Sequence, residues 1–546
     1  MERIRKSFRS VHRMTAIAVV AAVTVALAGG ALATPKIQQG TLIHLADGDV
    51  QGTINGSTRQ FLGIPFAAPP LGALRWKPPV PPQPWQNVLQ ANAFALPCAQ
   101  LESIQAAASD NEDCLYLNVW TPDPAPKKPR PVMVWFHGGG NQNGSAGDPV
   151  PFPNVPGLFY DAHVLAGERD VVVVTINYRL NAFGFFAHPA LAAEDPTYPY
   201  AGNQGLLDQH AALEWVHANI AAFGGDPKKV TIFGESAGSF DVCFHMVSPA
   251  SRGLFGRGIS ESGGCTTRTP TAAEGAAAAE EFTAAVGCGG AADELACLRQ
   301  LPVSALLAQV AQAEGGITNP IVDGGFIPDQ PRTLFDSGNF AKVPYILGSN
   351  ADEGTLFFIG VPAVTTEAEY LAALQTRYGA LAPQVAAVYP ASSFATPQDA
   401  LVRAFGDQIL VCPTYDTARR AAAGGAHTYL YNFARVLPIR LLQLIGLKAF
   451  HGSEIVYVFG SIHLPTPADE TIAETVRAYW TRFAKSGNPN GPGRTRWPRY
   501  RDAVDKRLNI DVDTTAITGF RRRECEFWWG VYDAQFAGSP SGAFLD

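Results

Sequence analysis

The sequence predicts an α/β fold built on a doubly wound, mostly parallel sheet. Two observations carry this prediction: short runs of Val, Ile and Tyr recur along the chain, and helical stretches separate them. Several runs are continuous rather than alternating, which is typical of strands covered on both faces. Strands that alternate with helices in this way form parallel sheets. With 546 residues, 47% of them apolar, the chain has enough apolar side chains for a large core.

The individual elements follow from the same pattern. Strands are predicted for residues 132–136, 171–177, 230–233, 258–261, 343–347 and 428–433. Helices are predicted for residues 206–222, 272–286 and 367–378. Residues 41–66 alternate more and contain an Asp-Gly and an Asn-Gly pair, so we expect antiparallel hairpins at the edge of the sheet. Because no internal repeat or clean linker is found, we expect one domain, residues 34–546, with helical insertions.

Residues 1–33 have the pattern of an export signal. The start is basic, with Arg3, Arg5, Lys6, Arg9 and Arg13. Residues 15–28 are almost wholly apolar, and the small residues Ala31 and Ala33 form a cleavage site. The alternative is a membrane anchor, but a span needs ~20 apolar residues. We therefore expect cleavage, a secreted or periplasmic protein, and no stable membrane anchor.

The charge of the mature chain indicates what it does not bind. Removal of residues 1–33 leaves 36 basic and 47 acidic residues, a net charge of about −11. A protein of this charge repels nucleic acids and anionic membranes. We therefore expect neither as a partner.

In an exported protein, eight cysteines are expected to form disulfides. Their number is even, and two pairs are close in sequence, Cys98 with Cys114 and Cys288 with Cys297. Connectivity does not follow from sequence alone. Zinc binding is the alternative, but no cysteine pair has the close spacing of zinc ligands.

The stretch VTIFGESAGSF, residues 230–240, predicts a nucleophile. A run of β-formers ends at Gly234, and a helix-like run begins after Gly238, with Ser236 between them. A tight strand-turn-helix corner lifts a serine oxygen clear of the sheet and leaves no room for side chains two residues away on either side. The helix N-terminus adds a favourable partial positive charge. A strand before Ser236 and a helix after it make this G-x-S-x-G far more specific than the motif alone.

The stretch VMVWFHGGG, residues 132–140, predicts an oxyanion loop. Three glycines follow a hydrophobic strand, and their backbone can approach a substrate carbonyl without interference from side chains. N–H groups fixed in this way can each contribute ~3 kcal/mol to a transition state. A flexible glycine loop is the alternative, but the serine corner downstream favours the catalytic interpretation.

Six stretches, in order along the chain, carry a family resemblance. They are GIPFAAPPLGALRWKPP (63–79), EDCLYLNVWTP (112–122), VWFHGGG (134–140), NYRLNAFGFF (177–186), GNQGLLDQ (202–209) and FGESAGS (233–239). The chain resembles the type-B carboxylesterase/lipase family, which includes the cholinesterases, over essentially all of its mature length. This resemblance implies an α/β-hydrolase fold, a mostly parallel twisted central sheet with helices on both faces, and hydrolysis of small-molecule esters without a metal or organic cofactor.

The base and the acid follow from chain order, which in this fold runs Ser, acid, His. His451 opens HGSEIVYVFG, which resembles the family's catalytic-histidine segment; His427 falls in a predicted strand and His463 in a loop. After the strand 343–347, Glu353 resembles the family's acid, while Asp352 competes on chemistry alone. We therefore expect a triad of Ser236, Glu353 and His451.

The resemblance assigns further residues. It implies that the N–H groups of Gly139, Gly140 and Ala237 hold the oxyanion. It also places three polar side chains behind the active site, those of Glu235, Ser262 and Asp407. The ion pairs Arg75–Glu112 and Arg179–Asp208 are implied as parts of the scaffold. The implied disulfides are Cys98–Cys114, Cys288–Cys297 and Cys412–Cys525, which leaves Cys243 and Cys265 either paired or reduced.

Two departures from the family bear on the substrate. The 15 residues between Cys98 and Cys114 include no aromatic side chain to bind choline, which argues against cholinesterase activity. Asn141 and Gln142 stand where relatives often have an aromatic residue, so we expect a more polar pocket wall beside the oxyanion hole. A lipase for longer acylglycerols, an amide hydrolase and a non-catalytic binding protein are the alternatives to a carboxylesterase.

Overall fold

A mixed sheet organises the chain. The computed structural model describes residues 36–104, 106–151, 157–313, 317–462, 464 and 466–536, so the predicted signal segment lies outside the described residues. Among these residues, eleven strands pair in the order β14-β13-β12-β11-β10-β9-β7-β8-β6-β4-β3. Their bounds are β3 (Thr53–Asn55), β4 (Thr58–Pro65), β6 (Tyr116–Pro122), β7 (Arg130–Phe136), β8 (Val172–Ile176), β9 (Gly225–Glu235), β10 (Arg257–Glu261), β11 (Tyr345–Asn350), β12 (Thr428–Phe433), β13 (Lys506–Ile510) and β14 (Thr515–Thr518).

The middle of the sheet is parallel and its two sides are antiparallel. Every pair from β8 through β7, β9, β10, β11 and β12 to β13 is parallel. Strands β6, β4 and β3 on one side and β14 on the other pair antiparallel. This arrangement confirms the predicted α/β class. Because neighbouring parallel strands end at the same edge, the residues that follow β7, β9 and β11 are brought close together.

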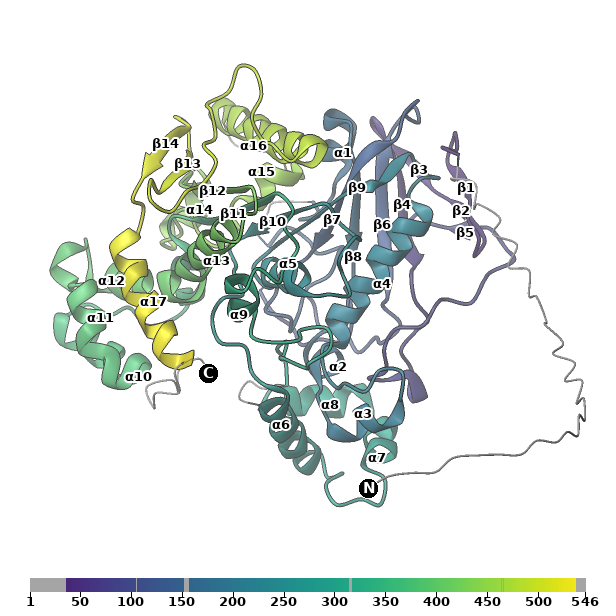
Figure 1. The fold of residues 1–546 in the computed structure, drawn as a ribbon, viewed down its shortest axis with the longest axis horizontal. Coiled ribbons are helices and arrows are strands. Elements are labelled where there is room, and N and C mark those ends of the chain that lie inside the picture. Colours follow the sequence, from purple (N-terminus) through teal and green to yellow (C-terminus); the bar gives the residue numbers. More distant parts are fainter. Residues whose placement is uncertain are drawn as a thin grey trace, which may run out of the picture. The chain divides into compact units, whose positions relative to one another are not determined.

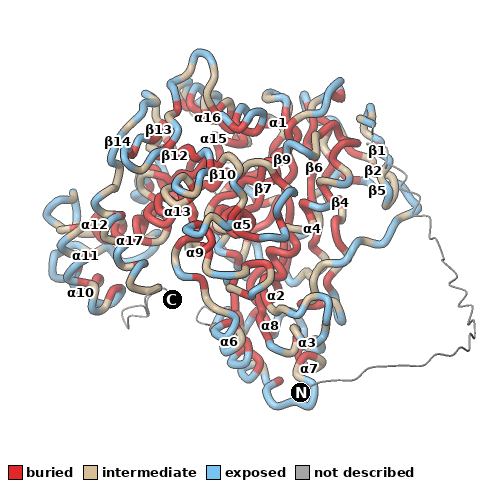
Figure 2. The backbone as a smooth tube through the Cα atoms, viewed as in Figure 1, coloured by how far each residue is buried: buried red, intermediate tan, exposed pale blue. Residues whose placement is uncertain are grey.

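Alternate residues of β7 belong to two separate cores. Val132, Val134 and Phe136 pack in a core with residues of α4 (Gln204–Asn219) and α5 (Ala237–Val247). Met133 and Trp135 pack in a core with residues of α1 (His163–Arg169), α15 (Ile455–Phe459) and α16 (Pro467–Ser486). Successive side chains of a strand point to opposite faces, so both faces are covered (Figures 1 and 2). This explains the continuous apolar runs in the sequence.

The remaining helices lie mostly in two long connections. Their bounds are α2 (Asn181–Phe185), α3 (Pro189–Glu194), α6 (Ala272–Ala285), α7 (Glu294–Gln300), α8 (Val303–Val310), α9 (Pro331–Asp336), α10 (Glu367–Tyr378), α11 (Ala382–Val388), α12 (Pro397–Gly406), α13 (Cys412–Ala423), α14 (Arg440–Leu444) and α17 (Arg522–Phe536). Helices α6 to α9 lie between β10 and β11, and α10 to α13 lie between β11 and β12. Figure 1 shows α10, α11 and α12 grouped beside α17. All described residues belong to one compact unit, residues 35–546.

The N-terminal hairpins only partly follow the prediction. Strands β3 and β4 form a hairpin at the edge of the main sheet, as expected. Strands β1 (Leu42–His44) and β2 (Asp49–Gln51) also form a hairpin, but it pairs with β5 (Leu89–Gln90) in a separate small sheet. The expectation that both hairpins extend the main sheet was therefore wrong for the first one. Its partner, β5, is too short to be recognised from sequence.

Within the described part of the chain, no helix is both long and apolar enough to cross a bilayer.

Candidate active site

Ser236 occupies a sharp corner between β9 and α5. Its backbone has φ 55° and ψ −124°, a conformation that a side-chain-bearing residue rarely adopts. A Cβ on Gly234 would lie 2.5 Å from the carbonyl oxygen of Gly238, and a Cβ on Gly238 would overlap the carbonyl oxygen of Phe136. Both glycines are therefore required by close backbone contact, as the sequence predicts.

The glycine loop after β7 passes directly beside this corner. In the parallel register Phe136 is paired with Gly234, so the segments that follow the two strands run together. A Cβ on Gly138 would lie 3.1 Å from the Cβ of Ser236. Gly139 and Gly140 have φ of 107° and 65°, which turns the loop across the end of the sheet. The predicted oxyanion loop therefore lies against the predicted nucleophile.

Three N–H groups at this place are available to a ligand. Among the described residues, no acceptor is bound to the N–H of Gly139, Gly140 or Ala237. Ala237 is the first residue of α5, where backbone N–H groups have no partner within the helix. The helix N-terminus favours negative charge at this point.

His451 contacts Glu353, and Asp352 faces elsewhere. Nδ1 of His451 lies 2.7 Å from Oε2 of Glu353, and both side chains are buried. The other oxygen of Glu353 accepts a hydrogen bond of 2.7 Å from the N–H of Asn350, at the end of β11. Asp352 instead accepts a hydrogen bond of 3.0 Å from Arg403. A carboxylate at Nδ1 fixes the tautomer that leaves Nε2 free to act as a base.

The free side of the imidazole faces the serine corner. Nε2 of His451 lies 3.2 Å from Oε1 of Glu235, the residue bonded to Ser236. Nε2 makes no hydrogen bond with any described residue, Ser236 included. Hydrogen bonds of this kind are often loose in ligand-free enzymes and tighten when substrate binds. The imidazole thus lies beside the serine corner without a hydrogen bond to the hydroxyl of Ser236.

Buried carboxylates control the charge of His451. Burial disfavours its charged form, but the carboxylates of Glu235 and Glu353 outweigh burial and raise the pKa of His451 to about 9. Burial also raises the pKa of Glu235 to about 8, although His451 opposes this increase. The two neighbouring carboxylates therefore stabilise the protonated form of His451. The imidazole can accept a proton only after it has lost this one.

Glu454 and Glu261 are acidic neighbours that the sequence analysis missed. Glu454 accepts a 2.5 Å hydrogen bond from Asn350, and burial raises its pKa to about 7. Glu261 accepts a 2.9 Å hydrogen bond from Trp480, and burial raises its pKa well above the ordinary value. The carbonyl oxygen of Glu261 also accepts the N–H of Ser236. The signal available for Glu454 was its position three residues after the histidine in the sequence.

The three polar residues expected behind the site have different surroundings. Glu235 contacts His451 directly. The hydroxyl of Ser262 lies 3.5 Å from Glu454, so Ser262 reaches the site only through that acid. Asp407 accepts a hydrogen bond of 3.1 Å from Tyr389 and, with Glu353, lines a cavity of about 480 Å³ behind the acid. No contact joins Asp407 to His451 among the described residues.

The expectation that Asn141 and Gln142 both form a polar pocket wall was wrong for Asn141. Asn141 is 3% exposed, and its amide contacts the side chains of Asp241 and Tyr178 rather than the space beside the loop. The positive φ of Asn141, 57°, turns the side chain inward. Gln142 is exposed. Two other histidines were weighed as bases: His427 is exposed just before β12 rather than within a strand, and His463 lies outside the described residues.

Four disulfides hold the scaffold. They join Cys98 to Cys114, Cys243 to Cys265, Cys288 to Cys297, and Cys412 to Cys525. The pair that the sequence left open is thus bonded, and it ties α5 to the loop after β10. Disulfides in this number are typical of proteins that fold in an oxidising environment.

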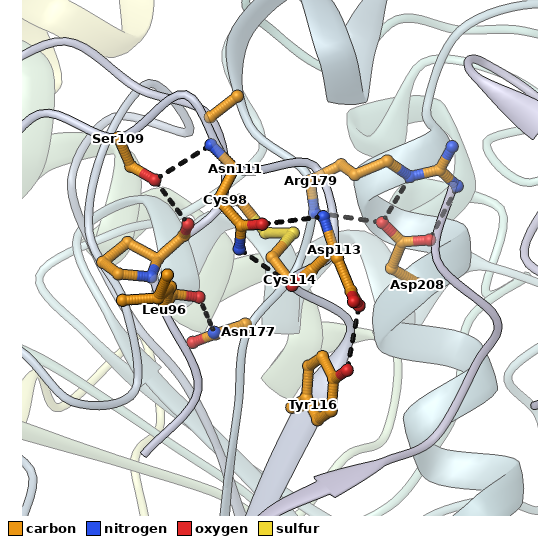
Figure 3. Close-up of a disulfide and its surroundings, with 12 residues drawn as sticks. Leu96, Cys98, Ser109, Asn111, Asp113, Cys114, Tyr116, Asn177, Arg179 and Asp208 are labelled. Atoms are coloured by element: carbon orange, nitrogen blue, oxygen red, sulfur yellow. Dashed lines mark hydrogen bonds and ion pairs between the residues drawn. A yellow bond between two sulfur atoms is a disulfide. The ribbon is translucent and has the colours of Figure 1, made fainter. Parts of the chain in front are cut away.

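The first disulfide closes a loop that is also held by hydrogen bonds. Figure 3 shows two hydrogen bonds beside Cys98 and Cys114. The N–H of Asn111 donates to the hydroxyl of Ser109, and the N–H of Asp113 donates to the side-chain oxygen of Asn111. The ion pairs implied by resemblance are formed as well. Arg179 and Asp208 lie 2.7 Å apart beside this loop (Figure 3), and Arg75 and Glu112 lie 2.5 Å apart.

Fold and site together define a class. A parallel sheet that carries a serine on a strand-to-helix corner, beside a glycine loop and a buried His-Glu pair, is the arrangement of an α/β-hydrolase. The chain matches the model of the carboxylesterase family over residues 39–528, and it belongs to that family. It is a carboxylic ester hydrolase, as its motifs predict.

A relative of known name is similar over most of the chain. The fumonisin B1 esterase of Sphingopyxis macrogoltabida is 36% identical over 477 residues, which cover 84% of each chain.

Proposed function

We propose that this protein is an exported serine carboxylesterase that cleaves small-molecule esters through Ser236, His451 and Glu353. The observation that carries the proposal is the 2.7 Å contact between Glu353 and His451, with the free nitrogen of that imidazole beside the serine corner. Residues 1–33 would be the cleaved signal, and residues 34–546 the single catalytic domain. The four disulfides support export because thiols stay reduced in most cytosols.

The reaction follows from the placement of these groups. Nε2 of deprotonated His451 takes the proton of Ser236 as the hydroxyl oxygen attacks the ester carbonyl. The N–H groups of Gly139, Gly140 and Ala237 bind the resulting oxyanion. His451 then returns the proton to the leaving alcohol, and an acyl-serine remains. Water, deprotonated by His451, then attacks this acyl group, and the acid is released as the oxygen of Ser236 leaves and takes the proton back from His451.

Glu353 keeps the imidazole in the reactive orientation during both steps. Its Oε2 accepts the Nδ1 proton, and its second oxygen is fixed by the N–H of Asn350. The carboxylate stabilises the imidazolium that forms in each transition state and does not itself take up the proton.

Three substitutions test the assignment. Ser236→Ala should abolish hydrolysis of p-nitrophenyl acetate, and Glu353→Gln should lower kcat by about 10⁴-fold because the tautomer is no longer fixed. Asp352→Asn is the matched control: its side chain is bonded to Arg403, and kcat should change little. Full activity of the serine variant would refute the proposal. A large loss in the Asp352 variant with none in the Glu353 variant would move the acid by one residue.

The similar protein suggests a substrate class for this chain. Since the similar protein is named for fumonisin B1, we propose an ester of that kind as a substrate here. Rates with fumonisin B1 and with p-nitrophenyl esters from acetate to palmitate would test this proposal. A clear preference for palmitate over all others would instead indicate a lipase.

A further inference from the structure

A buried chain of polar side chains leads away from the oxyanion loop. We call it the polar chain, and it consists of Tyr178, Asn141, Asp241, Gln209 and His245. Each member is buried. The polar chain starts at the glycine loop and ends inside the protein, so it links the oxyanion loop to α4 and α5.

At the loop end, Tyr178 and Asn141 fix the two ends of the glycine segment. The hydroxyl of Tyr178 donates to the carbonyl oxygen of His137 at 2.7 Å, and its ring stacks on His137 with centroids 4.4 Å apart. Asn141 directly follows Gly140, and its carbonyl oxygen accepts the N–H of Asn181 at 2.7 Å. The side-chain oxygen of Asn141 lies 3.1 Å from the same Tyr178 hydroxyl. Residues 138–140 are therefore held between His137 and Asn141.

At the helix end, Asp241 holds the amide of Asn141. Its Oδ1 accepts from Nδ2 of Asn141 at 3.2 Å, and its Oδ2 accepts from Nε2 of Gln209 at 2.6 Å. Among the described residues no Lys, Arg or His forms an ion pair with this carboxylate. A buried carboxylate without a cation depends on its hydrogen-bond donors. The two amides are therefore required partners.

The far end of the polar chain supplies partners that agree with this direction. The side-chain oxygen of Gln209 faces Nε2 of His245 at 3.1 Å, and Nδ1 of that histidine faces the hydroxyl of Ser251 at 2.7 Å. Because an ionised carboxylate only accepts, the amino group of Gln209 must face Asp241, which leaves its oxygen towards His245. Asp241 is therefore an acceptor on both sides, and Asn141 must present its amino group to it.

We propose that Asp241 is a positioning residue for ester hydrolysis, which fixes the oxyanion loop by holding the side chain of Asn141. The proposal rests on the proposed function, because it needs Gly139 and Gly140 to bind the oxyanion. Asp241 lies on α5, the helix that begins just after Ser236. One rigid element therefore sets both the nucleophile and the donors that receive the charge, which is the preorganisation that stabilises an oxyanion.

An exchange of the two side chains distinguishes positioning from a merely structural role. Asp241→Asn leaves one of the two amide donors, that of Asn141 or that of Gln209, without an acceptor. Asn141→Asp places the new carboxylate against that of Asp241. The double variant N141D/D241N restores every bond. Asp at 141 would accept from Tyr178 and from the amide at 241, whose oxygen would accept from Gln209.

The assay is run at a pH well above 7, because burial raises the pKa of Asp241 to about 7 against the hydrogen bonds from Gln209 and Asn141. We expect each single variant to lose about 10- to 100-fold in kcat/KM per titrated active site. This loss is no larger than that caused by complete removal of one oxyanion donor, about 10²- to 10³-fold. Affinity for a trifluoromethyl ketone, which forms a tetrahedral oxyanion on the serine, should fall by the same factor. The double variant should regain at least about tenfold of each single loss.

Controls separate the possible failures. Asp416→Asn removes a buried carboxylate on α13 that is bonded to Arg419 and Arg420, and it should lower stability without changing kcat/KM. If D241N does not fold, Asn141→Ala breaks the same contact from the loop end and should show the same loss. The proposal is overturned if the single variants keep wild-type kcat/KM and inhibitor affinity, or if the exchange recovers neither. An active Ser236→Ala enzyme would overturn the proposed function instead.

Discussion

Replacing Glu235 by glutamine removes the carboxylate that lies beside Nε2 of His451, the nitrogen proposed to act as the base. The carboxylate oxygen lies 3.2 Å from Nε2, and both side chains are at most 5% exposed. The change preserves shape and leaves the contact between His451 and Glu353 in place. It therefore isolates the effect of one charge on the pKa of the imidazole.

The size of the effect follows from the distance. Two unit charges 3.2 Å apart interact by about 5 kcal/mol at an effective dielectric constant of ~20. One pKa unit corresponds to about 1.4 kcal/mol, so loss of Glu235 is worth more than one unit even when its own partial protonation is allowed for. The pKa of His451, raised to about 9 by Glu235 and Glu353 against burial, should therefore fall by at least about one unit.

The direction of the change in the pKa of His451 can be measured from the pH dependence of kcat/KM. If His451 is the base, a raised pKa keeps it protonated at lower pH, so kcat/KM of the parent enzyme should rise as the pH increases towards about 9. In Glu235→Gln the same rise should occur at lower pH. Hydrolysis of p-nitrophenyl acetate from about pH 6 to about pH 10 measures it.

The matched control is Glu454→Gln. Glu454 also raises the pKa of His451, but it is the weakest of the carboxylates acting on it. Its loss should move the profile less than the loss of Glu235. A Glu235→Gln profile that coincides with the parent profile, or one that moves to higher pH, would refute this account of how the imidazole is charged.

Two further predictions concern the scaffold. Gly238→Ala should lower the free energy of unfolding by about 3 kcal/mol, because the new methyl group overlaps the carbonyl oxygen of Phe136. Gly140→Ala meets open space and should cost about 1 kcal/mol for its positive φ; urea unfolding measures both, and equal stabilities would contradict the clash. Replacing Cys412 and Cys525 by serine opens a 113-residue loop and should cost about 5 kcal/mol, so an unchanged urea midpoint would show that the loop is held by other contacts.

The sequence predicts the centre of the fold better than its margins. All six predicted strands are present, because continuous apolar runs such as that of β8 are fixed by burial on both faces. Strands β6, β13 and β14 were not predicted. β14 is largely exposed, and β13 begins with charged Lys506 and Arg507, so their pairing depends on contacts distant in sequence. The first hairpin was misplaced because its partner strand has only two residues.

Much of the candidate site follows from local sequence, and its surroundings do not. Ser236 and Glu353 are found because strand ends place them. The inward turn of Asn141 was missed because it depends on a positive φ and on a carboxylate 100 residues away, at Asp241. Glu454 was missed because its partner Asn350 lies 104 residues earlier. Side-chain direction and long-range pairing are not encoded in short motifs.

The positions of the three proposed reactive groups have an evolutionary consequence. Ser236 and Glu353 are separated by α6 to α9, and Glu353 and His451 by α10 to α14. Ser236 follows β9, Glu353 lies shortly after β11, and His451 lies in the segment after β12. The insertions can therefore lengthen, shorten or change composition while the chemistry stays intact. In such an architecture, changes in the inserted helices can alter which substrates bind while the three reactive groups keep their positions. One hydrolytic core can thereby act on many different esters.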